Sequence, residues 1–127
     1  TMASIIEKES ASNSERALIA GVFVARLDLG MRLQSDPTTI YGMGDRYAGN
    51  IRRADLLEET PYNTYRIDGM PPTPIALSGK ESIVAALNPS ASDYLYFVAR
   101  VDGSHQFSRT LEEHNAAVRE HQLGSSN

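Results

Sequence analysis

The chain has 127 residues, of which 41% are hydrophobic and 22% charged, a composition typical of a folded domain with a sizeable core. Its formal net charge of −4 argues against nucleic acid as the main partner, because a phosphate backbone requires a basic surface. No cysteine is present, which excludes disulfides, thiolate catalysis and cysteine-ligated zinc. The longest apolar runs are far shorter than the roughly 20 residues that span a bilayer.

The start of the chain shows neither a basic leader nor a cleavage-type boundary. It opens directly on an apolar helical pattern, which indicates a piece of a longer protein. The length and composition predict that residues 1–127 form a single domain.

Residues 2–10 have the spacing of an amphipathic helix. At about 100° per residue, Met2, Ile5 and Glu9 share one stripe, whereas Glu7 points in roughly the opposite direction. The second carboxyl of this helix is therefore predicted to lie on its apolar face.

Further helix signals follow along the chain. Residues 12–15 fit a capping box, and the apolar spacing after them predicts a helix that runs to Leu29. Asp36 as an N-cap, followed by Pro37, predicts a brief helix through Tyr41.

The central part of the chain is rich in Gly, Pro, Asn, Tyr and Arg between residues 45 and 74. One short helix is predicted within it, at 54–59. Long irregular segments commonly carry binding residues, so we expect binding surface here.

A second capping box at residues 78–81 predicts a helix that ends before Asn88-Pro89. The apolar side chains Ile83, Val84 and Leu87 are expected to point inward from this helix. It would thus pack its larger side chains against the core.

The C-terminal part has the pattern of a hairpin followed by a helix. Segments 94–101 and 104–109 flank an Asp-Gly turn, and a third capping box at 110–113 opens a helix to about Leu123. The predicted fold class is α+β: a helical N-terminal part, a long irregular or β insert, an antiparallel hairpin and a terminal helix.

Glu9 is the most unusual residue of this pattern. A carboxyl in an apolar stripe loses hydration, so its pKa rises from about 4.3 and it can act as a general acid near neutral pH. The alternative is a structural role in which Glu9 closes the helix and pairs with Lys8 or Arg16. Spacing alone favours this alternative, because perturbed carboxylates are often structural.

Other constellations point to binding rather than to metal or cofactor chemistry. His114 and His121 lie a heptad apart but lack metal-site spacing, so neither a metal nor a cofactor is expected. Six of the nine aromatic residues are tyrosines, several of them near amide and carboxyl side chains. Such surfaces suit sugars, whose apolar faces stack on rings and whose hydroxyls need polar partners. Tyr94 and Tyr96 could equally be ordinary strand residues that cover a core.

Several strings of residues, in order along nearly the whole chain, resemble the endolytic murein transglycosylases of the MltG/YceG-like family. The strings are Ala3-Ser4-Ile5-Ile6-Glu7-Lys8-Glu9, Arg26-Leu27, Gly30 to Thr38, Ile40-Tyr41-Gly42, Tyr62-Asn63-Thr64-Tyr65, Gly69-Met70-Pro71-Pro72, Ala85-Ala86-Leu87-Asn88-Pro89 and Tyr94-Leu95-Tyr96-Phe97-Val98.

This resemblance implies that the second Glu of the Glu-Lys-Glu string, Glu9, is the single catalytic acid/base. It also implies non-hydrolytic cleavage of the β-1,4 bond between N-acetylmuramic acid and N-acetylglucosamine in peptidoglycan glycan strands, which leaves 1,6-anhydromuramyl ends. Family members carry an N-terminal membrane helix and a LysM-like domain. The full-length protein is accordingly expected at the bacterial inner membrane, with this soluble part in the periplasm and in contact with cell-wall synthases.

The resemblance and the side-chain chemistry together place a set of residues in the substrate cleft, where they would orient the sugars and their N-acetyl groups: Gln34, Asp36, Tyr41, Asn63 and Tyr65. Two alternatives remain open. One is a lysozyme-like muramidase, a hydrolase that would use Glu9 together with Asp36 as the second carboxylate. The other is a non-catalytic module that binds glycan or docks on a synthase.

Overall fold

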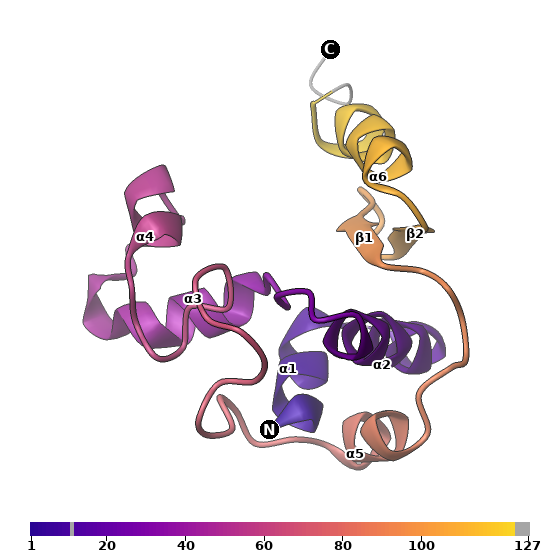
Figure 1. The fold of residues 1–127 in the computed structure, drawn as a ribbon, viewed down its shortest axis with the longest axis horizontal. Helices are drawn as coiled ribbons and strands as arrows, with labels where there is room; N and C mark the ends of the chain where they lie inside the picture. Colours follow the sequence, from indigo (N-terminus) through magenta and orange to yellow (C-terminus); the bar gives the residue numbers. More distant parts are fainter. Residues whose placement is uncertain (11, 124–127) are drawn as a thin grey trace.

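The structure is a computed structural model that describes residues 1–10 and 12–123. Over these residues it contains six α-helices and one two-stranded antiparallel sheet, a mixed α+β fold as predicted (Figure 1). The elements in chain order are α1 (Met2–Glu9), α2 (Asn13–Asp28), α3 (Asp36–Met43), the 3₁₀ helix Gly44–Arg46, α4 (Arg53–Leu57), α5 (Lys80–Leu87), β1 (Tyr96–Ala99), β2 (His105–Ser108), α6 (Leu111–Val118) and the π-helical turn Arg119–Leu123.

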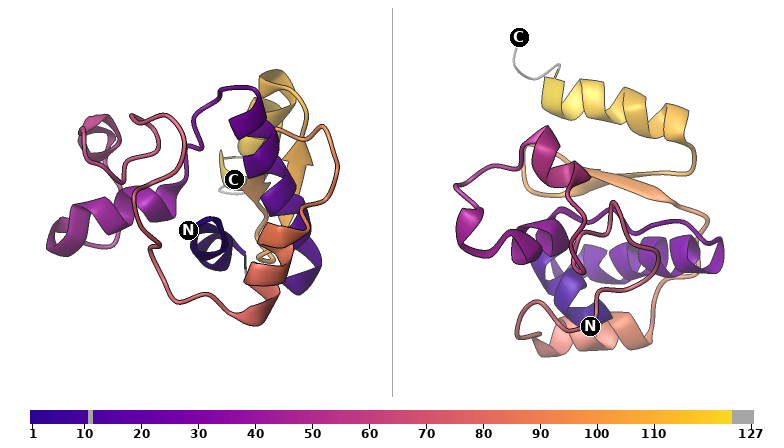
Figure 2. Two further views of the ribbon diagram at one scale, coloured as in Figure 1. Left: turned by 60° about the horizontal axis from the view of Figure 1, so that its bottom comes forward. Right: turned by 60° about the vertical axis from the view of Figure 1, so that its left-hand side comes forward.

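The elements stack in layers, with α5, α2, the β1–β2 hairpin and α6 following one another from one end of the molecule to the other (Figures 1 and 2). The first helix, α1, packs beside α2 and α5, while α3 and α4 project to one side. None of the described helices has the length and apolar character needed to cross a membrane.

The core lies where α1 and α2 meet the loops and α5. Its buried members are Ile5, Ile6, Ile19, Ala20, Phe23, Leu33, Ile75 and Ala85. Phe23 also reaches the next layer, because its ring meets that of Phe97 edge to face at 5.8 Å. The stripe predicted for α1 does face this core, since Ile5 is fully buried and Met2 packs against the cluster.

The predicted helix after residue 12 is present, but the predicted capping box is not. Ser12 occupies the N-cap position of α2, but its hydroxyl bonds to the Ser14 hydroxyl at 2.8 Å and accepts from no backbone N–H of the helix. The carboxylate of Glu15 instead accepts from the backbone N–H of His105 and contacts its ring nitrogen Nδ1. Glu15 therefore ties α2 to the hairpin rather than capping its own helix.

The prediction for the inward face of α5 was wrong. Ile83, Val84 and Leu87 are exposed, and the helix turns Ser82 and Ala85 inward. Small side chains allow α5 to approach α1 and α2 closely, which overrides the preference for burying larger ones.

The N-terminus of α5 is capped by another helix. No side chain of the predicted box caps it. The Glu7 carboxylate accepts from the Gly79 backbone N–H and the Ser82 hydroxyl, each at 2.8 Å. These bonds, led by the one from Gly79, lower the pKa of Glu7, which suits a carboxylate at a helix N-terminus.

The insert between α3 and α5 contains no strand in the described structure, so only the irregular part of the predicted irregular or β insert is observed. Asn63, 1% exposed, holds this segment together. Its Nδ2 donates to the carbonyls of Asp55, Leu56 and Glu58, and its Oδ1 accepts from the Tyr65 N–H. Side-chain bonds to the backbone thus take the place of a sheet ladder.

The C-terminal hairpin and helix match the prediction closely. β1 pairs antiparallel with β2, with Tyr96 opposite Ser108, and Gly103 takes the positive φ of 88° that the turn requires. The Thr110 hydroxyl accepts from the Glu113 N–H at 3.1 Å and caps α6 as predicted. The strands are shorter than their predicted spans.

Candidate active site

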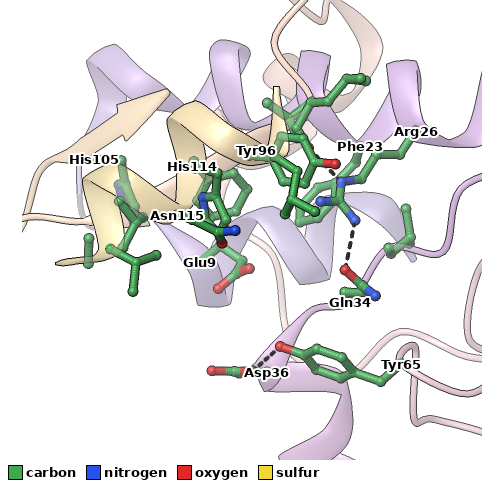
Figure 3. A pocket seen from close by; sticks show the side chains of 18 residues that line it. Glu9, Phe23, Arg26, Gln34, Asp36, Tyr65, Tyr96, His105, His114 and Asn115 are labelled. Atoms are coloured by element: carbon green, nitrogen blue, oxygen red, sulfur yellow. Dashed lines mark hydrogen bonds between the residues drawn. The ribbon is translucent and has the colours of Figure 1, made fainter. Parts of the chain in front are cut away.

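A cavity of about 500 Å³ opens where α2, the hairpin and α6 meet the end of α1 and the start of α3 (Figure 3). Its polar and ring-bearing lining residues are Glu9, Phe23, Arg26, Gln34, Asp36, Tyr65, Tyr96, Phe97, His105, His114 and Asn115. Four of the predicted site residues, Glu9, Gln34, Asp36 and Tyr65, therefore meet in one place. They come from three segments of the chain.

Glu9 is the last residue of α1, and its carboxyl faces the cavity (Figure 3). Burial raises its pKa from 4.5 to about 7, with a further rise from the nearby charge of Asp36. The Ser35 hydroxyl, 3.4 Å from Oε2, acts in the opposite direction. Among the described residues Glu9 forms no ion pair, so the structural alternative of a pair with Lys8 or Arg16 is not what the fold shows.

Asp36 lines the cavity, and the prediction that it is the N-cap of α3 was wrong. That position belongs to Ser35, and Asp36 is the first helical residue. Its carboxylate accepts a hydrogen bond of 2.5 Å from the Tyr65 hydroxyl. Burial, and then this bond, raise the pKa of Tyr65 above its ordinary value, so the phenol stays neutral and continues to donate.

The loop that carries Tyr65 is fastened to the start of α3. The Ser35 backbone N–H donates to the Thr64 hydroxyl at 2.8 Å, and that hydroxyl lies 2.8 Å from the hydroxyl of Thr38. All three residues are buried. Segments about 30 residues apart in sequence thus present Asp36 and Tyr65 to the cavity as one unit.

Arg26 and Gln34 form another side of the cavity (Figure 3). The Arg26 Nε donates to the Leu95 carbonyl at 2.7 Å, while Nη1 donates to the Arg32 carbonyl and to the Gln34 Oε1. Gln34 has a φ of 54°, the one positive value at a non-glycine residue in the described chain. Such a conformation costs roughly 1 kcal/mol and is often found at functional sites.

An aromatic group from the C-terminal layers closes the remaining side. The rings of Tyr96 and His114 stack at 5.1 Å, and the Arg26 guanidinium lies 4.9 Å from the Tyr96 centroid. Burial, and then the charge of Arg26, lower the pKa of His114, which favours its neutral form. A flat ring next to hydrogen-bonding side chains is a suitable surface for a sugar.

The two remaining predicted site residues do not line this cavity. Tyr41 is half-exposed on α3 and packs its ring against that of Tyr62 at 4.8 Å. Asn63 is buried, with its amide occupied by the bonds that organise the insert. Across the described residues, no group of three or more His, Cys, Asp and Glu side chains is arranged to hold a metal ion.

Arg26, His114 and Asn115 also line the cavity and were not predicted from the sequence as site residues. One signal could have identified Arg26. It falls four residues after Val22 and three after Phe23, inside the buried stripe of α2, where a permanent charge is as unusual as Glu9 in α1. No comparable local signal exists for His114 and Asn115. Their position in the cavity depends on how α6 packs against the hairpin, which the sequence of α6 alone does not show.

The fold and the cavity define an α+β domain with one carboxyl suited to acid–base chemistry. A family model described as the YceG-like family matches residues 1–120, and the chain belongs to this family. It is 45% identical over its full length to an endolytic murein transglycosylase of Bacillus subtilis, of which it covers 35%. Over 95% of its length it is 39% identical to an endolytic murein transglycosylase of Streptococcus pneumoniae, of which it covers 23%.

A solved structure shares the fold. The crystal structure of a YceG-like protein from Listeria monocytogenes superposes with a TM-score of 0.86 at 51% sequence identity. The match covers 92% of this chain and 38% of that one. The chain thus spans well under half of the length of each of these relatives.

Proposed function

We propose that this chain is the catalytic domain of an endolytic lytic transglycosylase that cleaves peptidoglycan glycan strands, with Glu9 as its single acid/base. The observation that carries the proposal is the Glu9 carboxyl, which faces a cavity of about 500 Å³ with a pKa of about 7. A group with this pKa is present in both protonation states at neutral pH, as a residue that must both donate and accept a proton requires. The names of the relatives support the same reaction.

The reaction needs one proton carrier and no water. Protonated Glu9 donates to the oxygen of the β-1,4 bond as the bond from muramic C1 to that oxygen breaks. The resulting carboxylate then takes the proton of the C6 hydroxyl, and O6 bonds to C1 to close the 1,6-anhydro ring. Glu9 ends protonated, so one carboxyl completes the cycle.

The other cavity residues would bind and orient the sugars. Tyr65 and Asp36 offer a hydroxyl and a carboxylate, and Gln34 offers an amide whose oxygen is held by Arg26. Asn63 contributes indirectly in this proposal, because its Oδ1 fixes the backbone of Tyr65. Tyr41, on the outer face of α3, would contact a strand only beyond the cavity.

The test is a digest of purified glycan strands with this chain, followed by mass spectrometry. Anhydromuramyl ends, one water lighter than reducing ends, are the expected product. Glu9→Gln should abolish cleavage, whereas Glu7→Gln should retain it, because Glu7 serves as a cap for α5. Cleavage that survives Glu9→Gln but is lost in Glu7→Gln would overturn the assignment.

A hydrolase that pairs Glu9 with Asp36 is the second candidate, since Asp36 lies in the same cavity. A hydrolase needs its second carboxylate free to act as a nucleophile or to activate water. Here the Tyr65 hydroxyl already occupies Asp36 Oδ1. Reducing muramic ends in the digest would favour this candidate over the transglycosylase.

We also propose that the full-length protein is anchored in the inner membrane, with this domain in the periplasm and close to cell-wall synthases. The support is that the matched relatives are about three to four times longer than the region aligned here. Fractionation of the full-length protein would test its location, and crosslinking in cells would test contact with synthases.

A further inference from the structure

Arg26 is a buried cation without an anionic partner. The residue is 6% exposed, and no described carboxylate forms an ion pair with it. All three of its hydrogen bonds go to neutral oxygens, the carbonyls of Leu95 and Arg32 and the side-chain oxygen of Gln34. Buried charges are normally paired, so the protein keeps a costly arrangement here.

One end of this guanidinium is unused. Nε and Nη1 make the three bonds, while Nη2 donates to no group of the described protein. Nη2 is not one of the fully buried polar atoms that lack a partner in the described structure. Part of its surface is therefore accessible. Because Arg26 lines the cavity next to Tyr96, a ligand in the cavity can reach this donor (Figure 3).

Backbone carbonyls and neighbouring side chains hold the guanidinium in place. Its two bonded nitrogens connect the start of the hairpin to the loop before α3, and its Cζ lies 4.9 Å from the centroid of the Tyr96 ring. A donor fixed in this way loses little side-chain entropy when it binds a ligand. Arg26 is therefore preorganised to bind a ligand through its free nitrogen.

We propose that Arg26 binds the carboxyl-derived oxygen of the lactyl side chain of a muramic acid residue, and so distinguishes muramyl strands from chitin-like ones. This inference rests on the proposed function. Of the two sugars in the strand only N-acetylmuramic acid carries that group, as a carboxylate in bare strands and as an amide carbonyl where a peptide is attached. A carboxylate supplies the anion that Arg26 lacks, through a charge-assisted hydrogen bond.

The test measures binding by Glu9→Gln protein, which under the proposed function should not turn substrate over. Its ligands are a glycan fragment with free lactyl carboxylates, the same fragment with methylamidated carboxyls, and a chito-oligosaccharide of equal length. One charge-assisted bond predicts about tenfold or stronger binding of the carboxylate fragment than of the chito-oligosaccharide, with the amide between them. Equal affinity for all three ligands would overturn the inference, and this arm of the test needs no substitution of Arg26.

A second arm adds Arg26→Gln and Arg26→Lys in the same background, so that the Lys variant also keeps the test valid if the Gln variant fails to fold. The preference for muramyl ligands should fall to near one in Arg26→Gln and partly recover in Arg26→Lys. Arg109→Gln is the matched control, since Arg109 is exposed, pairs with Asp93, does not line the cavity and should leave the preference unchanged. A failed proposed function would show itself separately, as the absence of anhydromuramyl product from the wild-type chain.

Discussion

Glu9 should make the folding stability of the wild-type chain depend on pH in a direction that the structure fixes, and Glu9→Gln should remove this dependence. The pKa of Glu9 is about 7 in the folded chain and 4.5 ordinarily. A raised pKa means that the contribution of Glu9 to stability is fully present below 4.5 and is lost as pH rises through 7. The difference of about 2.5 pKa units, at about 1.4 kcal/mol each, corresponds to about 3 kcal/mol.

Gln cannot ionise, so the variant escapes that loss. Relative to wild type, the free energy of unfolding of Glu9→Gln should therefore increase by about 3 kcal/mol between pH 4 and pH 8. Urea denaturation followed by circular dichroism at pH 4, 6 and 8 measures this difference directly. A difference that stays constant over this range would refute the assignment of a raised pKa to Glu9.

Glu7→Gln is the matched control, two residues away on the same helix. Hydrogen bonds from Gly79 and Ser82 lower the pKa of Glu7, so its contribution has the opposite sign. That contribution is present above the ordinary pKa and is lost as pH falls through the lowered one. Glu7→Gln should destabilise the chain at pH 8 and approach wild-type stability at low pH.

Three further substitutions test the site and its frame. Asp36→Asn removes a charge that raises the pKa of Glu9, so the high-pH limb of the kcat/KM profile should move to lower pH; an unmoved limb would contradict that influence. Asn63→Ala leaves several buried backbone groups without partners, so the free energy of unfolding measured by thermal denaturation should fall by about 2–4 kcal/mol. A loss below about 1 kcal/mol would argue against the organising role of Asn63. Gly21→Ala should lower the free energy of unfolding in urea by about 1–3 kcal/mol, because a Cβ would meet the Ser90 carbonyl oxygen at 2.4 Å. Wild-type stability of this variant would show that the loop around Ser90 moves to accommodate the Cβ.

The sequence predicted those parts of the fold that local physics determines. The hairpin around the Asp-Gly turn and the Thr110 cap depend on a few adjacent residues, and both are observed. The inward face of α5 was mispredicted because packing against two other helices, rather than hydrophobicity, selects Ser82 and Ala85. Likewise, Glu15 fits a capping box in sequence, yet its carboxylate bonds to His105, 90 residues away.

The candidate site was predictable to a similar extent. Helical phase alone puts Glu9 on the inner face of α1, but the cavity that it faces is closed by α6, more than 100 residues later. Arg26 carries the same signal, a charge within an apolar stripe, and was missed because the stripe of α2 was read only for its apolar members. Asn63 shows the reverse case, because its residue type suits a sugar whereas its position serves the backbone.

The two carboxylates of the Glu-Lys-Glu string have pKa values shifted in opposite directions, because they face different surroundings. Glu7 meets two hydrogen-bond donors at the start of α5, which keep it charged and fix α1 against that helix. Glu9 meets one distant hydroxyl and the charge of Asp36, which together with burial favour its neutral form. The charged residue thereby anchors the helix whose end carries the neutral one. Two identical side chains on one helix can therefore hold opposite protonation states at pH 6, which is the condition for one to be structural and the other chemical.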